Sequence, residues 1–140
     1  DIAKFEWSKN KGIPRAASGL RLTARDLGKI GQLMLNGGRW NGREIVPETW
    51  VTASTSPHVD VEPDAVCPMQ YGYLWWIGGN CGAEPRSSWF AGFGFGGQRI
   101  WVIPSRKLVV ALTAGLYSDP KQGDAATTVL TGVLGGLPAH

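Results

Sequence analysis

The chain has 140 residues, of which 43% are hydrophobic and 18% are charged, so it holds enough apolar material for a core and is not a disordered chain. Its net charge of +3 comes from scattered lysines and arginines without a run of five, which argues against nucleic-acid binding. It shows neither a signal peptide nor the roughly 18 apolar residues of a membrane span, and its seven Trp and 20 Gly favour sheets over a helical bundle.

Residues 1–70 are predicted to form helices and loops. Residues 1–22 show little periodicity, and we expect an ordered loop that lies on another part of the protein. A helix should follow, because Thr23-Ala24-Arg25-Asp26 has the form of a capping box and Asn36-Gly37-Gly38 is a typical helix end. The apolar residues between these two signals share one helical face: Leu27, Ile30, Leu33 and Met34.

A hairpin, a short helix and a loop complete this part. Asn41-Gly42 is a strong signal for a tight hairpin turn, and the hairpin is expected to end near Val46. Pro47 suits the first residue of a helix that extends to about Ser54. Residues 55–70 contain three prolines and are predicted to be a loop.

Residues 71–140 are predicted to form antiparallel strands followed by a helix. Strands are expected at 71–77, 89–93, 98–103 and 108–113, with a polar loop at 78–88 and a tight turn at 104–107. The run 108–112 is apolar at every position, so both faces of the sheet should be covered. Asp124 can cap a last helix that ends at Gly135-Gly136 and carries an apolar stripe of Val129, Leu130, Val133 and Leu134. This order predicts an α+β fold, an antiparallel sheet flanked by helices.

The chain has two cysteines, Cys67 and Cys81, on either side of the apolar run 71–77. An even count near strand ends permits one disulfide, which suits an exported protein, and two free buried thiols are the alternative. The histidines, His58 and His140, have no Cys or His partner at metal-ligand spacing. We therefore expect no metal site, and no motif indicates a cofactor.

Four stretches follow one another in an order that belongs to a known family. They are Ser18-Gly19-Leu20-Arg21-Leu22-Thr23-Ala24-Arg25-Asp26-Leu27, residues 36–51, Tyr71-Gly72-Tyr73-Leu74-Trp75-Trp76, and Phe90-Ala91-Gly92-Phe93-Gly94-Phe95-Gly96-Gly97-Gln98. Together they resemble the β-lactamase-like serine hydrolases, the group of penicillin-binding proteins, class C β-lactamases, esterases and 6-aminohexanoate-dimer hydrolases. Within the group, the Gly-Gly-Gln before a strand resembles the esterase and 6-aminohexanoate-dimer hydrolase branch.

The resemblance implies that residues 1–140 are a single C-terminal fragment of a β-lactamase/transpeptidase-like domain. The group attacks an acyl carbon with the serine of an S-x-x-K pair, and a tyrosine or serine from a second motif moves protons. The chain lacks a match to these residues. Ser8-Lys9-Asn10-Lys11 fits the letters, but we reject it because the residues after Ser8 are polar and helix-ending, whereas the nucleophile begins a buried helix.

The group's third motif, K-T-G or a variant, corresponds by resemblance to Phe90-Ala91-Gly92. The small residues Ala91 and Gly92 would let a substrate lie along the strand edge, and the N–H of Phe93 would be one oxyanion-hole donor. Since the motif has no Lys, the carboxylate of a penicillin or peptide loses a partner, which argues against β-lactamase activity and leaves ester or amide hydrolysis open. The alternative is a glycine-rich strand and turn at 90–97 that serves packing alone.

The primary hypothesis is a C-terminal portion of a serine hydrolase that acts on a small-molecule ester, amide or peptide substrate and is inactive without its nucleophile segment. The alternatives are a carbohydrate- or cell-wall-binding module, with an aromatic platform of Trp75, Trp76 and Trp101, and a non-catalytic relative of the family. The alternating acids Asp60, Glu62 and Asp64 fit a solvated loop better than a glycosidase pair or a Ca²⁺ site.

The resemblance also predicts partners and location. In the family, strands from an N-terminal segment complete the sheet, so this chain alone should leave an apolar sheet edge. We expect that edge to bind the missing segment or a second copy by strand exchange. The usual export of proteins of this family, together with the two cysteines, predicts a periplasmic or secreted protein.

Overall fold

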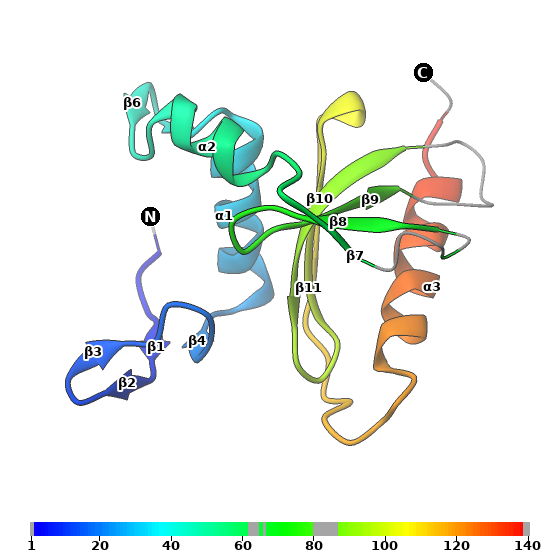
Figure 1. Cartoon of the computed structure of the whole chain (residues 1–140), viewed down its shortest axis with the longest axis horizontal. Coiled ribbons are helices and arrows are strands. Elements are labelled where there is room, and N and C mark those ends of the chain that lie inside the picture. The colour runs from blue at the N-terminus through cyan, green and yellow to red at the C-terminus, as the bar shows by residue number, and fades with distance from the viewer. Residues whose placement is uncertain (1, 62–64, 66, 80–86, 139–140) are drawn as a thin grey trace.

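The computed structural model describes residues 2–61, 65, 67–79 and 87–138. Its centre is a six-stranded antiparallel sheet in which each strand pairs with the next along the chain, in the order β12-β11-β10-β9-β8-β7. The strands are β7 (Val59–Val61), β8 (Met69–Tyr71), β9 (Trp76–Gly79), β10 (Ser88–Gly94), β11 (Gln98–Ile103) and β12 (Leu108–Leu112). Figure 1 shows helices on opposite sides of this sheet, as the α+β prediction required.

Two helices cover the two faces of the sheet. Helix α1 (Ala24–Leu35) packs on β11 and β12, and α3 (Gln122–Gly135) covers the opposite face. The main core lies under α3 and contains Trp89, Ala91, Trp101, Ile103, Ala126, Leu130 and Leu134. The prediction that the apolar run 108–112 is covered on both faces is therefore confirmed: β12 has α1 on one face, and its Val110 packs against the α3 core on the other.

Helix α1 begins and ends as predicted. The Thr23 side chain accepts a hydrogen bond from the Asp26 backbone N–H at 3.1 Å, which satisfies one free donor of the first turn. The helix approaches the sheet closely at Gly31, where an added Cβ would lie 2.5 Å from Val109 Cγ1. This close approach requires glycine, because a real Cβ cannot occupy that space.

Two small hairpins precede α1 where a loop was predicted. Strand β1 (Glu6–Trp7) pairs with β4 (Leu20–Arg21), and β2 (Lys9–Asn10) pairs with β3 (Ile13–Pro14). Strands of two residues are too short to show an alternating pattern, so no periodicity indicates them.

The hairpin and short helix after α1 are confirmed. Strands β5 (Arg39–Trp40) and β6 (Arg43–Glu44) join through Asn41 and Gly42 at φ of 49° and 76°, the backbone of a type I′ turn. Helix α2 (Glu48–Ser54) begins one residue after Pro47, which is its N-cap.

The predicted strand 71–77 is wrong, and so is part of the predicted loop 55–70. Strand β8 ends at Tyr71 and β9 begins at Trp76, while β7 and the start of β8 lie in the supposed loop. The interruption has two causes. Gly72 lies against α2, where an added Cβ would be 2.3 Å from the Ser54 carbonyl oxygen, and Leu74 has a φ of 65°, which is incompatible with a strand.

The turn and the helix at the end of the chain are confirmed in type. A 3₁₀ turn, η1 (Pro104–Arg106), joins β11 to β12. Helix α3 begins at Gln122, so Asp124 lies in its first turn and is not the N-cap residue. The predicted stripe is partly wrong, because Leu130 and Leu134 are buried whereas Val129 is exposed.

Candidate functional site

Strand β10 carries the motif expected at an active site, and its two sides differ along its length. It pairs with β11 as far as Gly94, opposite Gln98, but with β9 only as far as Ala91, opposite Trp76. Beyond Ala91, β11 is therefore the one strand of the described residues that pairs with β10. Backbone polar groups point alternately to the two sides of a strand, so residues 92–94 present some of theirs to the open side. The first two motif residues lie between two strands, and the open edge begins at Gly92.

Ala91 and Phe93 point into the core under α3. Ala91 is fully buried, and the Phe93 ring stacks on Trp76 with 5.5 Å between centroids. The Arg99 guanidinium carbon lies 4.6 Å from the centre of the Phe93 ring. Neither side chain faces the open edge, so a ligand there would meet only their backbone.

The opposite face of β10 belongs to Phe90, Gly92 and Gly94, because side chains alternate along a strand. The Phe90 ring meets the edge of Trp75 with 5.2 Å between centroids. The two glycines have no side chain on this face, but β11 side chains lie beside them: an added Cβ at Gly92 would be 2.9 Å from Ile100 Cγ2, and one at Gly94 would be 2.9 Å from Gln98 Cβ. An aromatic pair thus stands at one end of a strip, Gly92–Gly94, whose backbone at the open edge can pair with an extended or acyl group.

Arg99 is a buried cation at the end of this strand pair, with 8% of its surface exposed. Its Nη1 donates hydrogen bonds to the carbonyl oxygens of Gly94 and Gln98, both at 2.9 Å. Burial lowers the pKa of the Arg99 guanidinium from its ordinary value. Because that ordinary value lies far above neutral, the side chain stays charged and holds the two carbonyls by charge-assisted bonds.

Two glutamine side chains hold the turn between β10 and β11. Gln122 Oε1 accepts hydrogen bonds from the N–H groups of Gly96 at 2.6 Å and Gly97 at 3.1 Å. The Gln98 amide pairs with the backbone of Ala114, accepting from its N–H at 3.2 Å and donating to its carbonyl. Sequence reasoning assigned no role to Gln122, because no local pattern links it to a turn 25 residues earlier.

The rejected nucleophile motif does not form a helix. Ser8 lies between β1 and β2, and its backbone N–H donates to the Gly19 carbonyl at 2.9 Å. Lys11 lies in the following turn with a φ of 49°. Ser8 and Lys11 are therefore not one helical turn apart on a buried helix, as an S-x-x-K pair must be.

His58 takes part in packing. Its Nε2 lies 2.8 Å from the Ala53 carbonyl oxygen. Its ring stacks on Tyr73, with 4.1 Å between centroids, and Tyr73 in turn stacks on Trp50. His58 is therefore one ring of an aromatic stack with Tyr73 and Trp50.

The other candidates are dispersed. The aromatic platform is not formed, because Trp101 is 2% exposed and Trp76 packs against Phe93 in the core. Asp60 accepts a hydrogen bond from Gln70 at 2.8 Å, while Glu62, Asp64 and His140 lie outside the described residues. Within the described ranges, no group of three or more His, Cys, Asp or Glu residues could hold a metal ion. No helix there is long and apolar enough to cross a membrane.

Cys67 is disulfide-bonded. Its Sγ lies 3.4 Å from the Gly79 carbonyl oxygen, and since a disulfide sulfur has no proton to donate, this is a packing contact. Cys81 lies outside the described residues. The pairing of Cys67 with Cys81 therefore stays a prediction.

Neither of the two best-formed hollows on the described surface is lined by residues 92–94. One, of about 600 Å³, is lined by residues of the N-terminal hairpins between Ala3 and Thr23. The other, of about 430 Å³, lies over β8 and β9 and includes Asp60 and Gln70. Neither brings a nucleophile to a base, so the open edge of β10 is the better candidate for the site.

Comparison with known proteins agrees with the predicted family and fold. The model of the Beta-lactamase family matches residues 3–132. The 6-aminohexanoate-dimer hydrolase of Paenarthrobacter ureafaciens is 30% identical over 115 residues, which span 78% of this chain and 28% of that protein. The solved structure named "Putative 6-aminohexanoate-dimer hydrolase from Bacillus anthracis" matches with a TM-score of 0.66 and 24% identity, over 94% of this chain and 34% of that one. The structural match shows a shared fold, and the chain corresponds to a minor part of each relative's length.

Proposed function

This chain belongs to the beta-lactamase family, and we propose that it is the C-terminal part of a serine hydrolase that cleaves an ester, amide or β-lactam bond through an acyl-enzyme. The names of both relatives support hydrolysis, since each is a 6-aminohexanoate-dimer hydrolase by name. The chain matches 28% and 34% of their lengths, which is compatible with a nucleophile on a segment outside this sequence. On this proposal the chain alone is inactive.

The open side of β10 beyond Ala91 is the observation that carries the proposal. A substrate carbonyl lying beside Gly92 and Gly94 would receive a hydrogen bond from the Phe93 N–H, and the nucleophile's own N–H would supply the second donor. Such donors stabilise an oxyanion because the fold sets their direction before the charge develops. The Phe93 side chain is anchored in the core, which keeps its backbone in place.

The chemistry of the strip favours an ester or an amide over a penicillin. Phe90 stands at the motif position where a lysine would bind a carboxylate, and its neighbour on that face is Trp75. Arg99 is on the other face, where carbonyl oxygens and the Phe93 ring already surround it. We therefore propose an uncharged acyl group as the part of the substrate that contacts Phe90 and Trp75.

The primary test compares this chain with the longer hydrolase of the proposal, in which the nucleophile segment is joined to it. Both are treated with a chromogenic p-nitrophenyl ester and a fluorescent penicillin, and labelled residues are identified by mass spectrometry. We expect ester turnover and a labelled serine in the longer protein alone. Labelling of Ser8 would contradict the rejection of its motif, and sugar binding with no labelled residue would support a carbohydrate-binding module.

A backbone substitution tests the donor itself. Replacing the Phe93 amide by an ester in a semisynthetic longer hydrolase removes the N–H and keeps the side chain. The expected loss is about 100-fold in kcat with little change in KM, because the bond forms fully only in the transition state. The matched control is the same replacement at Ala91, which lies between two strands. A loss of the same size at both positions would contradict the assignment.

We also propose that the outer edge of β12 binds a partner. This strand is the last in the sheet and carries Leu108, Val109, Val110, Ala111 and Leu112, all half-buried. An apolar edge of this length tends to recruit another strand, either from the N-terminal segment or from a second copy. Light scattering of this chain at micromolar concentration should show a dimer, and a monomer would count against self-pairing.

Export to the periplasm or outside the cell stays a proposal. The bonded state of Cys67 supports it, since disulfides persist in oxidising compartments. Cell fractionation of the longer hydrolase, with a reporter fused to its C-terminus, distinguishes export from retention in the cytoplasm.

A further inference from the structure

The turn between β10 and β11 is held by side chains that are distant in sequence. Gly96 and Gly97 have φ values of 81° and 88°, a conformation that glycine adopts with little cost and that two adjacent glycines do not hold by themselves. Both of their N–H groups point at one oxygen, Oε1 of Gln122. Gln122 is the first residue of α3, so a helix on one face of the sheet fixes the end of the strand pair.

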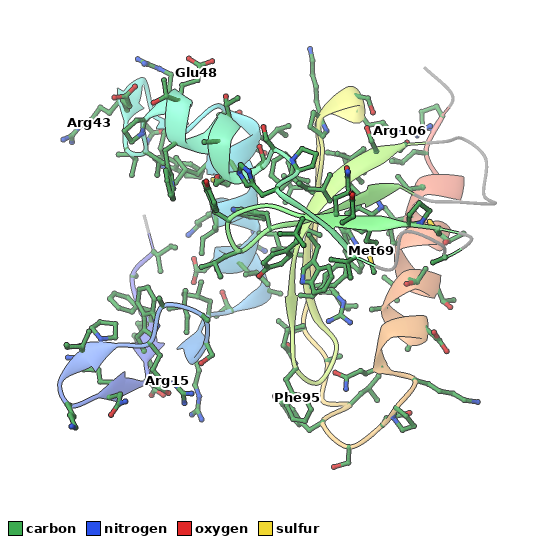
Figure 2. The ribbon with its side chains drawn as sticks, in the orientation of Figure 1. Arg15, Arg43, Glu48, Met69, Phe95 and Arg106 are labelled. Carbon is green, nitrogen blue, oxygen red and sulfur yellow. The ribbon has the colours of Figure 1, made fainter. Side chains whose placement is uncertain are left out.

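A second set of contacts holds the turn from the segment after β12. The Gln98 side-chain amide pairs with both backbone polar groups of Ala114. The Leu116 N–H donates to the Gly96 carbonyl at 3.0 Å. The ring of Tyr117 covers Gly96 so closely that an added Cβ would lie 2.5 Å from it. Figure 2 shows Phe95 at the tip of this turn, just beyond the open edge.

We propose that Gln122 is a positioning residue for the hydrolase, acting on the Phe93 N–H through the Gly96-Gly97 turn; this inference rests on the function proposed above. Beyond Ala91, β11 is the only described strand that pairs with β10. The direction of the Phe93 N–H therefore depends on the register with β11, which begins at the turn. Gln122 closes the turn by accepting two hydrogen bonds at one oxygen, so it fixes the geometry of the turn.

Gln98 supports the same geometry from the neighbouring strand. Its backbone pairs with Gly94, the last residue of the open edge, while its side chain is held by Ala114. Together the two glutamines explain why the Gly-Gly-Gln stretch has this composition: the glycines bring two N–H groups to one acceptor, and the glutamine ties the next strand to the segment beyond β12.

The test uses two variants of Gln122 that differ in one property. Gln122→Met keeps the length of the side chain and removes the oxygen acceptor, whereas Gln122→Glu keeps an acceptor for both N–H groups. In this chain, exchange of the Gly96 and Gly97 amide protons should become about five- to tenfold faster in Gln122→Met and stay near the wild-type rate in Gln122→Glu. Gln70→Met is the matched control, because Gln70 bonds Asp60 far from the turn.

In the longer hydrolase, Gln122→Met should lower kcat for the p-nitrophenyl ester by about 10- to 100-fold with KM unchanged. Gln122→Glu should keep most of the wild-type kcat. Unchanged amide exchange in Gln122→Met would show that Gln122 does not hold the Gly96-Gly97 turn, whatever the activity. Faster exchange with unchanged kcat would show a structural role alone and overturn the positioning role. If the wild-type hydrolase forms no acyl-enzyme, the proposed function fails and this role fails with it, while the exchange result still reports on the turn.

Discussion

The N-terminal hairpins and the β10–β11 strand pair use apolar residues in opposite ways. In the hairpins, Phe5 is 62% exposed and Ile13 is 71% exposed, although each belongs to an ordered segment. In β11, every residue from Arg99 to Ile103 is buried. Figure 1 shows the reason: the hairpins stand beside α1 without a helix over them, whereas β11 lies between α1 and α3.

The two regions therefore depend on different interactions, local turns in one and long-range packing in the other. The hairpins owe their form to local turns, such as Lys11 and Gly12 with φ values of 49° and 84°. The strand pair owes its form to layers of side chains that come from distant parts of the sequence. Changes in the strand pair should therefore alter global stability, while changes in the hairpins should stay local.

The largest effect is expected from Trp101→Ala. Trp101 is 2% exposed at the centre of the α3 core, and truncating such a residue costs about 3–5 kcal/mol through lost burial and a cavity. Trp7→Ala is the matched change in the hairpins, where the ring is 38% exposed and its Nε1 donates to the Arg15 carbonyl. Its expected cost is about 1 kcal/mol.

Urea unfolding followed by far-UV circular dichroism measures both variants. The comparison predicts a large fall in the urea concentration at the unfolding midpoint for Trp101→Ala and a small fall for Trp7→Ala. Equal falls would contradict it, because they would mean that the hairpins are part of the same cooperative core as the sheet.

Glycines of α1 offer a sharper test of the layered region. An added Cβ at Gly31 would lie 2.5 Å from Val109 Cγ1, so Gly31→Ala should cost about 1–3 kcal/mol by overpacking. At Gly28, on the same helix, the added Cβ would meet Ala111 at an ordinary 3.8 Å. Gly28→Ala should therefore stabilise the protein by about 0.5–1 kcal/mol, because alanine favours the helix.

Thermal unfolding of the two variants gives the sign of each effect. Adding Val109→Ala to Gly31→Ala should recover part of the loss, since it removes the side chain that the new methyl group meets. Destabilisation by both Gly28→Ala and Gly31→Ala would show that α1 tolerates no added atoms at either position and would refute the role of close approach at Gly31 alone.

The contrast between the two regions also explains what could be predicted from the sequence. Helix α1 was predicted from a local cap, Thr23 to Asp26, and strands β10 to β12 from apolar runs. The turn at Gly72 was missed because its cause is the approach of the Ser54 carbonyl from α2.

The candidate site divides in the same way. The candidate motif Phe90-Ala91-Gly92 was proposed from its order in the chain. The point where β9 leaves β10, after Ala91, follows from tertiary structure alone. Gln122 could not be found at all, since its partners are two backbone N–H groups in a distant turn.

Leu74 lies between two strands of the sheet, but the effect of changing it should be local, as in the hairpins. Its φ of 65° is a left-handed conformation, which costs a non-glycine residue about 1–2 kcal/mol. Its side chain is largely exposed, so Leu74→Gly should lose little packing and stabilise the protein by about 1 kcal/mol or less. Leu130→Gly, in buried α3, is the contrasting change and should destabilise strongly. A lower melting temperature for Leu74→Gly would show that the exposed side chain contributes more than the strain it causes.

The smallest effect is expected from Asp26 at the N-terminus of α1, the helix that follows the hairpins and packs on β11. The Lys29 ammonium, 2.6 Å away, and the Thr23 hydroxyl, at 2.9 Å, both donate to its carboxylate and lower the pKa of Asp26. A carboxyl whose pKa is lower in the folded state adds stability that is present above its unfolded pKa, and that stability is lost as the pH falls through the folded pKa. Part of the fall in melting temperature below about pH 4 should therefore depend on Asp26.

Asp26→Asn and Lys29→Met should each reduce that fall. The double variant should reduce it no further than Asp26→Asn does, because both changes remove the same interaction. If Asp26→Asn keeps the wild-type pH dependence, other carboxyl groups control acid unfolding and the cap acts through geometry alone.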